Sequence, residues 1–509
     1  MERDGNAKSS SGITRRGFLA WVGAGAALLG WNASARSAAA RSGTPKPTPT
    51  IGSSPTTTTP PTPTVTATAS ATSPAPPQPG AGHLLPSGYL RTSGSQIVDV
   101  NGNVVRLAGV NWYGFDCSSM VVGGLDHQTV DAICQKTVSL GFNCIRLPFC
   151  VQVVTSNPVI VNYLGANSGL VGKTALEIMD VVINTAGAHG LKVVLDSHRA
   201  EAGWSEQSNG LWYTQAYSDQ VWISSWKTLV QRYASNQTVI GADLHNEPGA
   251  PPQDGAAWPQ NNGSEWGYND PNPTYNTSTY PGDWAAAAQR AGNAVLSVNP
   301  NLLIFVEGVR YDPAGPNLNG TSYLYWPGGN LVGVSSPGGP RPSGVNIQLS
   351  VNNQPVTDKL VYSAHDYGPE MYSGLAWCQV NPDGTGSGAT SDACYSIWDQ
   401  SWGYLVRNKI APVMIGEFGT VNGYKPNDDT PQQDYTDINS DHVAQGYWFT
   451  YLVNYLSTKG ISWCYWSLNG SQSLAPGRDP SQADWYGVLK PDWSDYASAP
   501  MMKKLQTIQ

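Results

Sequence analysis

The sequence predicts an α/β protein with a (β/α)8 TIM barrel, because short apolar runs alternate with amphipathic helical patterns beyond residue 85. Eight such runs occur, at 105–112, 142–148, 191–197, 239–245, 302–308, 360–366, 411–417 and 461–467. Continuous apolar strands separated by helices indicate a parallel sheet whose outer face is covered. Eight strand–helix units over about 400 residues favour closure into a barrel.

A β-hairpin precedes the first barrel strand. Residues 96–105 have an Asn-Gly turn at Asn101–Gly102, and we expect this hairpin to close the N-terminal end of the barrel. The helical patterns are equally clear: Trp222 and Trp226 share a face after Ser218, a good N-cap residue. An open, doubly wound sheet is the alternative. It is disfavoured because no glycine-rich phosphate-binding turn follows the first strand.

The N-terminal residues are expected to be an export signal and a spacer. Arg15 and Arg16 belong to a twin-arginine motif, which an apolar run at 21–31 and small residues follow. We therefore predict a signal peptide at 1–41 and secretion from a bacterium. The next segment is rich in Pro, Thr and Ser, a composition that cannot bury a core, which predicts a disordered linker at 42–84. Residues 85–509 then form the barrel domain.

Composition limits the class of partner. The chain has 28 Lys and Arg against 36 Asp and Glu, a net charge of −8. An acidic surface repels nucleic acid and anionic lipid, so we expect neither as a partner and no membrane insertion after signal cleavage. The 19 Trp and 25 Tyr outnumber the 7 Phe, which indicates amphipathic surfaces that meet a hydrated ligand. We expect a monomer without metal or cofactor.

An exported chain is expected to pair some of its cysteines. The odd number of seven leaves at least one thiol free. Cys378 and Cys394 bracket a polar loop and are the best candidate pair, and Cys117 with Cys150 is a second candidate. Metal binding is the weaker interpretation, because no two cysteines have the close spacing of metal ligands. The remaining cysteines are Cys134, Cys144 and Cys464.

Polar side chains stand near the C-terminal end of almost every predicted strand. Active sites of this fold lie at that end, and buried charges are costly unless they are paired, so packing alone does not explain the pattern. The strand-end residues are Asn111, Trp112, Arg146, His198, Asn246, Glu247, Glu307, His365, Tyr367, Glu417 and Trp466.

Two of these residues predict the chemistry. Glu247 follows strand 4 and Glu417 ends strand 7, and these strands lie across the barrel mouth from each other. Two carboxyl groups about 5 Å apart are typical of retaining glycoside hydrolysis. Arg146 and Tyr367 are placed to keep Glu417 ionised as the nucleophile, and Asn246 to hold a sugar hydroxyl beside Glu247, the acid/base. A structural ion pair is the alternative for the two glutamates.

The other strand-end residues have less specific interpretations. Trp466 is expected to offer a platform for the apolar face of a sugar. His198 and His365 either contact sugar or brace the site. Glu307 is expected to be structural, and His245 is undecided. Trp112, Trp212 and Tyr213 either line subsites or pack in the core.

Six motifs in order resemble those of secreted bacterial cellulases of glycoside hydrolase family 5, in clan A. They are the segments around Arg146 (143–148), His198 (195–199), Asn246-Glu247-Pro248, His365-Asp366-Tyr367, Gly416-Glu417-Phe418-Gly419, and Trp466. The likeness runs from about Gly88 to Asp495. It implies a retaining endo-β-1,4-glucanase of the (β/α)8 fold, with Glu247 as acid/base and Glu417 as nucleophile.

Other features depart from the family. The loops after strands 4 and 5, at 249–283 and 309–359, are long, and residues 467–471 replace the Asn-Pro turn and acidic residue that similar cellulases tend to have. Because these loops shape the cleft, a β-mannanase, a mixed-linkage glucanase and a transglycosylase remain alternatives. A non-catalytic carbohydrate-binding protein is an alternative of another class, which the two glutamates disfavour.

Overall fold

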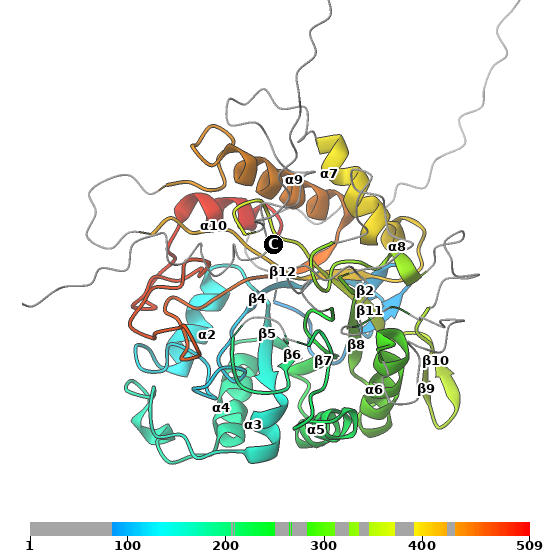
Figure 1. The fold of residues 1–509 in the computed structure, drawn as a ribbon, viewed down its shortest axis with the longest axis horizontal. Helices are drawn as coiled ribbons and strands as arrows, with labels where there is room; N and C mark the ends of the chain where they lie inside the picture. Colours follow the sequence, from blue (N-terminus) through cyan, green and yellow to red (C-terminus); the bar gives the residue numbers. More distant parts are fainter. Residues whose placement is uncertain are drawn as a thin grey trace, which may run out of the picture. The chain divides into compact units, whose positions relative to one another are not determined.

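The barrel is present and closed in a computed structural model of the chain. The structure describes residues 84–204, 207, 209–249, 264, 266, 282–310, 325–334, 346–371, 391–424 and 433–509. All eight predicted strands are confirmed, and each pairs in parallel with its neighbours around the ring (Figure 1). In chain order they are β4 (Ala108–Asn111), β5 (Cys144–Cys150), β6 (Lys192–Arg199), β7 (Val239–Asp243), β8 (Leu303–Glu307), β11 (Leu360–His365), β12 (Val413–Phe418) and β13 (Ser462–Tyr465).

Helices surround the barrel and cover the outer face of its strands (Figure 1). Their apolar faces are buried as expected: Trp222 and Trp226 are both fully buried, and Ser218 caps their helix by accepting from the Val221 N–H. The helices are α2 (Val130–Ser139), α3 (Val151–Ser156), α4 (Ala175–Ala188), α5 (Asp219–Arg232), α6 (Trp284–Val298), α7 (Ser391–Trp398), α8 (Tyr404–Arg407), α9 (Val443–Lys459) and α10 (Ala499–Gln506). Short helical turns lie at Ser168–Leu170, Val332–Val334 and Asp399–Gly403.

The predicted hairpin closes the N-terminal end of the barrel. It comprises β2 (Gln96–Val98) and β3 (Val104–Val105), and β1 (Arg91–Ser93) adds a third antiparallel strand. Gly102 takes a φ of 86° in the turn, which suits glycine. Ile97 packs in one cluster with interior barrel residues such as Val194 and Phe305. A second hairpin, β9 (Leu349–Val351) with β10 (Gln354–Val356), packs beside α6.

Several predictions fall outside the described residues. The signal peptide and almost all of the linker do so, and so does much of each long loop, after β7 and β8. Within the described part, no helix combines the length and apolar character that crossing a bilayer requires.

The predicted disulfide between Cys117 and Cys150 is wrong: both thiols are buried and free. The Cys150 Sγ accepts a hydrogen bond from the Val153 N–H at 3.3 Å, because Cys150 caps α3. The Cys117 Sγ lies 3.7 Å from an Asp116 oxygen. Each sulfur therefore has a local polar neighbour. Cys378 lies outside the described residues, so its pairing with Cys394 stays a prediction.

Candidate active site

Arg146 is the centre of a polar cluster in the upper part of the barrel. It lies on β5 with no exposed surface, so each N–H group needs a partner inside the protein. The guanidinium nitrogens lie within 3.1 Å of four carboxylates, those of Asp196, Asp243, Glu307 and Glu417, and of two amide oxygens, those of Asn111 and Asn246. Together with Arg146 these residues come from six strands, which only the closed barrel brings together.

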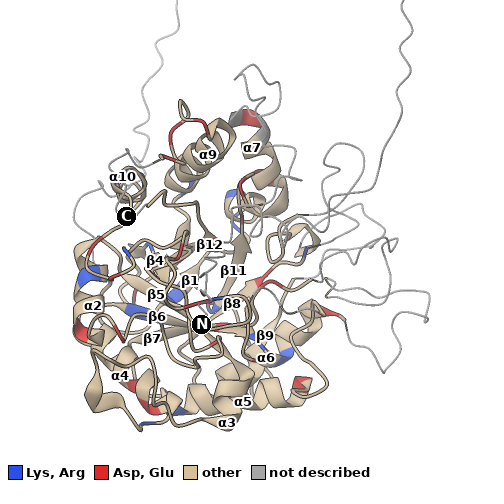
Figure 2. Cartoon of the chain, turned by 60° about the vertical axis from the view of Figure 1, so that its left-hand side comes forward, with Lys and Arg blue, Asp and Glu red and all other residues tan. Residues whose placement is uncertain are grey.

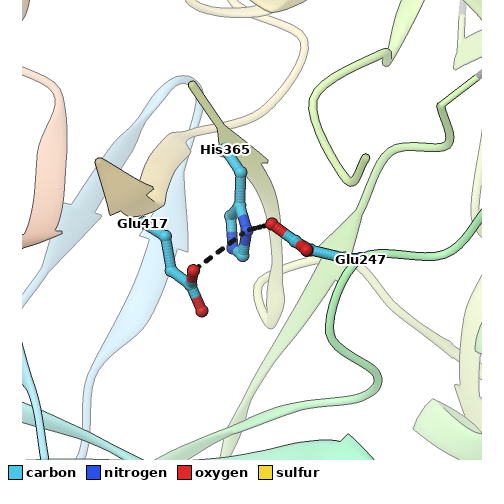
Figure 3. A group of neighbouring side chains, drawn as sticks. All are labelled: Glu247, His365 and Glu417. Carbon is cyan, nitrogen blue, oxygen red and sulfur yellow. Dashed lines mark hydrogen bonds and ion pairs between the residues drawn. The ribbon is translucent and has the colours of Figure 1, made fainter. Parts of the chain in front are cut away.

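The two predicted glutamates face each other at this cluster. One carboxylate oxygen of Glu247, one of Glu417 and a ring nitrogen of His365 all lie within 4.8 Å of one another. Figure 3 shows His365 between the two glutamates, with an interaction to each. Glu247 is 7% exposed and Glu417 4%, whereas Arg146, His365 and Glu307 have no exposed surface. The two glutamates thus form the face of the cluster that reaches solvent.

Glu247 is held in an unusual backbone conformation just beyond the end of β7. Its φ is 52°, in the left-handed region that non-glycine residues rarely occupy. Its N–H donates to the Glu307 Oε2 at 2.8 Å. Its Oε1 lies 3.0 Å from the His365 Nδ1 and accepts a bond from the Trp326 Nε1 at 2.7 Å. The surrounding residues therefore fix both the backbone and the side chain of Glu247.

Glu417 has a different set of neighbours. The Arg146 Nη1 donates to its Oε1 at 2.8 Å, and the Tyr367 hydroxyl donates to its Oε2 at 3.1 Å. Burial raises the pKa of Glu417 above its ordinary value, and the positive charges of His365 and Arg146 limit this rise. Two donors on one carboxylate favour its ionised form and point its lone pairs in defined directions.

The two candidate histidines differ in charge. Burial lowers the pKa of His365, but the carboxylates of Glu307 and Glu417 raise it well above its ordinary value, so His365 is protonated. Burial lowers the pKa of His198 well below its ordinary value, so its imidazole is neutral. The His198 Nδ1 lies 2.5 Å from the Asp196 Oδ2, within hydrogen-bond distance. His198 braces the cluster, and His365 links the two glutamates.

Aromatic rings adjoin the glutamates. Trp466 lies nearly parallel to His198 and to Tyr113, with centroids 5.4 and 5.2 Å away, and is 8% exposed. Trp204 stands beside Tyr113 at 5.3 Å, and the Arg478 guanidinium covers the Trp204 ring at 3.6 Å. These rings make an aromatic wall next to the cluster.

Some candidate residues are not at the site. Trp112 has no exposed surface, and its indole N–H donates to the Gly123 carbonyl at 3.0 Å, so it packs in the core and substrate contact by Trp112 is wrong. Trp212 is also fully buried, whereas Tyr213 is half-buried beside it. His245 faces the helix layer, 6.0 Å from Trp284 of α6.

Sequence reasoning missed several residues of the site, including the wall residues Tyr113 and Trp204 and three residues of the polar cluster. Asp196 precedes His198 by two positions on β6, and the period-2 pattern of a strand could have placed it on the same face. Asp243 ends β7 and is buried against Arg146, a position that the strand-end pattern could have flagged. Trp326 lies in a loop 79 positions after Glu247, and no local pattern connects the two residues.

Two carboxylate oxygens and a ring nitrogen converge at this site, from Glu247, Glu417 and His365. They are the one group of possible metal ligands found in the described part of the chain. In this structure these atoms are engaged with one another and with Arg146, Tyr367 and Trp326. The arrangement is one acid/base pair beside an aromatic wall.

Endoglucanases and an endocellulase are among the known proteins that this chain resembles. Over 411 residues the chain is 37% identical to an endoglucanase of Paenibacillus polymyxa, covering 80% of this chain and 84% of that relative. It is 32% identical over 410 residues to the major extracellular endoglucanase of Xanthomonas campestris, covering 80% and 68% of the two chains. A cellotetraose complex of an endocellulase from Pyrococcus horikoshii superposes with a TM-score of 0.64 at 31% identity. The match covers 83% of this chain and 99% of that chain.

The family profile described as cellulase (glycosyl hydrolase family 5) matches residues 98–472. That range includes both glutamates and all eight barrel strands. The resemblance noted in the sequence is confirmed, and the chain belongs to glycosyl hydrolase family 5.

Proposed function

We propose that this chain is a retaining endo-β-1,4-glucanase in which Glu417 is the nucleophile and Glu247 the acid/base. The observation that carries the proposal is the separation of at most 4.8 Å between oxygens of the two glutamates. Retaining glycosidases hold their carboxyl groups about 5–5.5 Å apart, whereas inverting enzymes leave room for a water between them. The endoglucanase relatives support a β-1,4-glucan as the polymer.

The first step forms a covalent glycosyl-enzyme. A Glu417 oxygen attacks the anomeric carbon while the bond from that carbon to the leaving oxygen breaks, and Glu247 gives its proton to that oxygen. Arg146 and Tyr367 direct the lone pairs of Glu417 and stabilise its negative charge before attack. The carboxylate is thus prepared without any reorganisation of solvent.

The second step releases the sugar with its anomeric configuration retained. Glu247, now ionised, takes a proton from water, the water oxygen attacks the anomeric carbon, and the ester to Glu417 breaks. The charge on His365 stabilises this ionised Glu247. One residue therefore serves as acid and then as base.

Asn246 contributes an oriented donor. Its side-chain oxygen accepts from the Arg146 Nη2 at 3.1 Å, which leaves the amide nitrogen to donate elsewhere. Its place beside Glu247 suits the 2-hydroxyl of the sugar in the reacting position, a contact that strengthens in the transition state. The exposed part of Trp466 is the platform proposed for the apolar face of a pyranose.

Variants of the two glutamates test the assignment. Glu417→Ala should abolish turnover of every substrate. Glu247→Ala should abolish hydrolysis of natural glucan but spare aryl cellobiosides with good leaving groups, because these need little protonation. Equal loss on both substrate classes would contradict the acid role. Proton NMR of the first product tests retention, and an α-configured first product would refute double displacement.

The polymer is tested with a panel of soluble cellulose derivative, mixed-linkage glucan and mannan. We expect new reducing ends to appear at internal positions of the β-1,4-glucan at the highest rate. Faster release from mannan would reassign the substrate. Binding without any cleavage, by a folded sample, would favour a carbohydrate-binding protein.

The finer partner assignments are also part of this proposal. We infer that residues 1–41 direct twin-arginine export and that the enzyme acts outside the cell as a monomer, without nucleic acid or membrane. Lys and Arg are dispersed among Asp and Glu over the outer helices in the view of Figure 2, which supports the absence of an anionic partner. A fusion of residues 1–41 to a reporter tests the export step in a bacterium with and without the twin-arginine pathway.

A further inference from the structure

Trp326 is anchored against the polar cluster by its own segment. This segment, residues 325–334, follows β8 after an interval outside the described residues. The Tyr325 N–H donates to the Arg310 carbonyl at 2.9 Å, and the Gly308 N–H to the Gly328 carbonyl at 2.8 Å. At Gly328, where φ is 77°, a Cβ would lie 2.3 Å from the Glu307 carboxylate. The segment therefore lies directly on the residues that hold Glu247.

The indole N–H of Trp326 donates to one oxygen of Glu247 only. The Nε1–Oε1 distance is 2.7 Å, short enough for a charge-assisted hydrogen bond. The His365 Nδ1 lies 3.0 Å from the same oxygen, and a protonated His365 is also a donor there. Because an indole nitrogen has no acceptor capacity, the Oε1 cannot give a proton to Trp326. Two donors thus saturate the Oε1 and leave the Oε2 as the oxygen that carries a proton.

We propose that Trp326 is a positioning residue that selects the Oε2 of Glu247 as the proton-transferring oxygen and aims it at the glycosidic bond. The inference rests on the proposed acid/base role of Glu247. Without the indole donor, the carboxyl group of Glu247 rotates more freely, and a proton on the Oε1 faces the protein instead of the leaving oxygen.

Trp326 also links the surroundings of the two glutamates. Its ring lies 4.7 Å from the ring of Tyr367, whose hydroxyl donates to Glu417. A substitution must keep this packing if it is to test the hydrogen bond alone. Trp326→Phe keeps an aromatic ring and removes the N–H. Trp326→benzothienylalanine keeps the bicyclic shape and replaces the N–H by sulfur.

The test compares substrates that differ in how much they need a proton. Loss of a hydrogen bond to a charged group should lower kcat/KM for cellotetraose about tenfold. The value for 2,4-dinitrophenyl cellobioside, whose leaving group needs no proton, should stay within about twofold of wild type. Across a series of aryl cellobiosides the rate should therefore become more sensitive to the basicity of the leaving group.

Trp402→Phe is the matched control. The Trp402 indole donates to the Tyr325 hydroxyl at 3.2 Å. This variant therefore also removes an indole N–H from a buried hydrogen bond, but not one to Glu247. It should leave the leaving-group dependence unchanged. Should Trp326→Phe fold poorly, the benzothienylalanine variant gives the same comparison.

Two outcomes would overturn the inference. If both variants at position 326 lower all aryl substrates and cellotetraose by the same factor, Trp326 acts in binding and not through Glu247. If neither variant changes the leaving-group dependence while Glu247→Ala changes it strongly, Glu247 is the acid but Trp326 does not position it. If Glu247→Ala itself shows no leaving-group dependence, the proposed function fails first.

Discussion

Replacing Asp243 by Asn tests whether the Asp243 carboxyl group stays protonated in the cluster around Arg146. Asp243 is fully buried, and its Oδ2 accepts from the Arg146 Nε at 2.9 Å. Its Oδ1 has no hydrogen-bond partner among the described residues. Burial raises the pKa of Asp243 well above its ordinary value, Arg146 lowers it, and the neighbouring carboxylates of Glu307 and Asp196 raise it further. We therefore predict that Asp243 keeps its proton above the pH at which a free carboxyl group loses it, and Asn is a neutral group of the same shape.

The sign of the pH dependence follows from this shift. A carboxyl group whose pKa is higher in the folded than in the unfolded protein destabilises the fold as pH rises above the unfolded value. Between the unfolded and the folded pKa, Asp243 then lowers the free energy of unfolding by about 1.4 kcal/mol per pH unit, and Asn has no such effect. The stability of Asp243→Asn relative to wild type should thus rise with pH throughout this interval.

Guanidinium denaturation of both proteins at several pH values measures this difference. Glu307→Gln is the control, because Glu307 bonds the Glu247 N–H and lies 2.9 Å from Arg146 and 3.1 Å from His365. It should be destabilised at every pH. If Asp243 were ionised, its replacement would break a buried ion pair and destabilise the protein by about 3–5 kcal/mol at pH 7. That result would refute protonation of Asp243. So would a stability difference between variant and wild type that does not change with pH.

Two further substitutions test other parts of the site. Arg146→Lys replaces three guanidinium nitrogens by a single ammonium nitrogen, so it should raise the pKa of Glu417. The acidic limb of the kcat/KM profile should then move to higher pH. An unmoved limb would show that Arg146 does not keep the nucleophile ionised. Trp204→Ala removes the outer ring of the aromatic wall and should raise KM for cellotetraose about three- to tenfold with little change in kcat. Unchanged KM would place Trp204 outside the sugar path, and Arg478→Gln separates loss of the ring from loss of the cation that covers it.

The barrel was predictable because its signals are local. Each apolar run is long enough to be a buried strand, and several helices have a capping side chain and an apolar face, as Ser218 and Trp222 show for α5. The Asn101–Gly102 turn predicted one hairpin, but not β1, whose three residues carry no pattern of their own. The same limit hid β9 and β10, which pack on α6 through contacts distant in sequence.

The thiols show why a plausible pair can be wrong. Cys117 and Cys150 both follow strands, which suggested proximity. In the structure the Cys150 sulfur caps α3, and burial raises the pKa of that thiol to about 12, which keeps it protonated. Sequence position does not reveal which backbone group a side chain will meet.

Order along the chain and residue type were enough to indicate the barrel, the face that carries the chemistry and the two glutamates, because strand periodicity and capping are properties of neighbouring residues. The partners of each carboxylate depend on the closure of the ring, which brings residues of five other strands to Arg146. Only the tertiary structure places the Trp326 indole against Glu247, because the two residues are 79 positions apart in the chain. Only packing of the chain buries Asp243 and removes water from its carboxyl group.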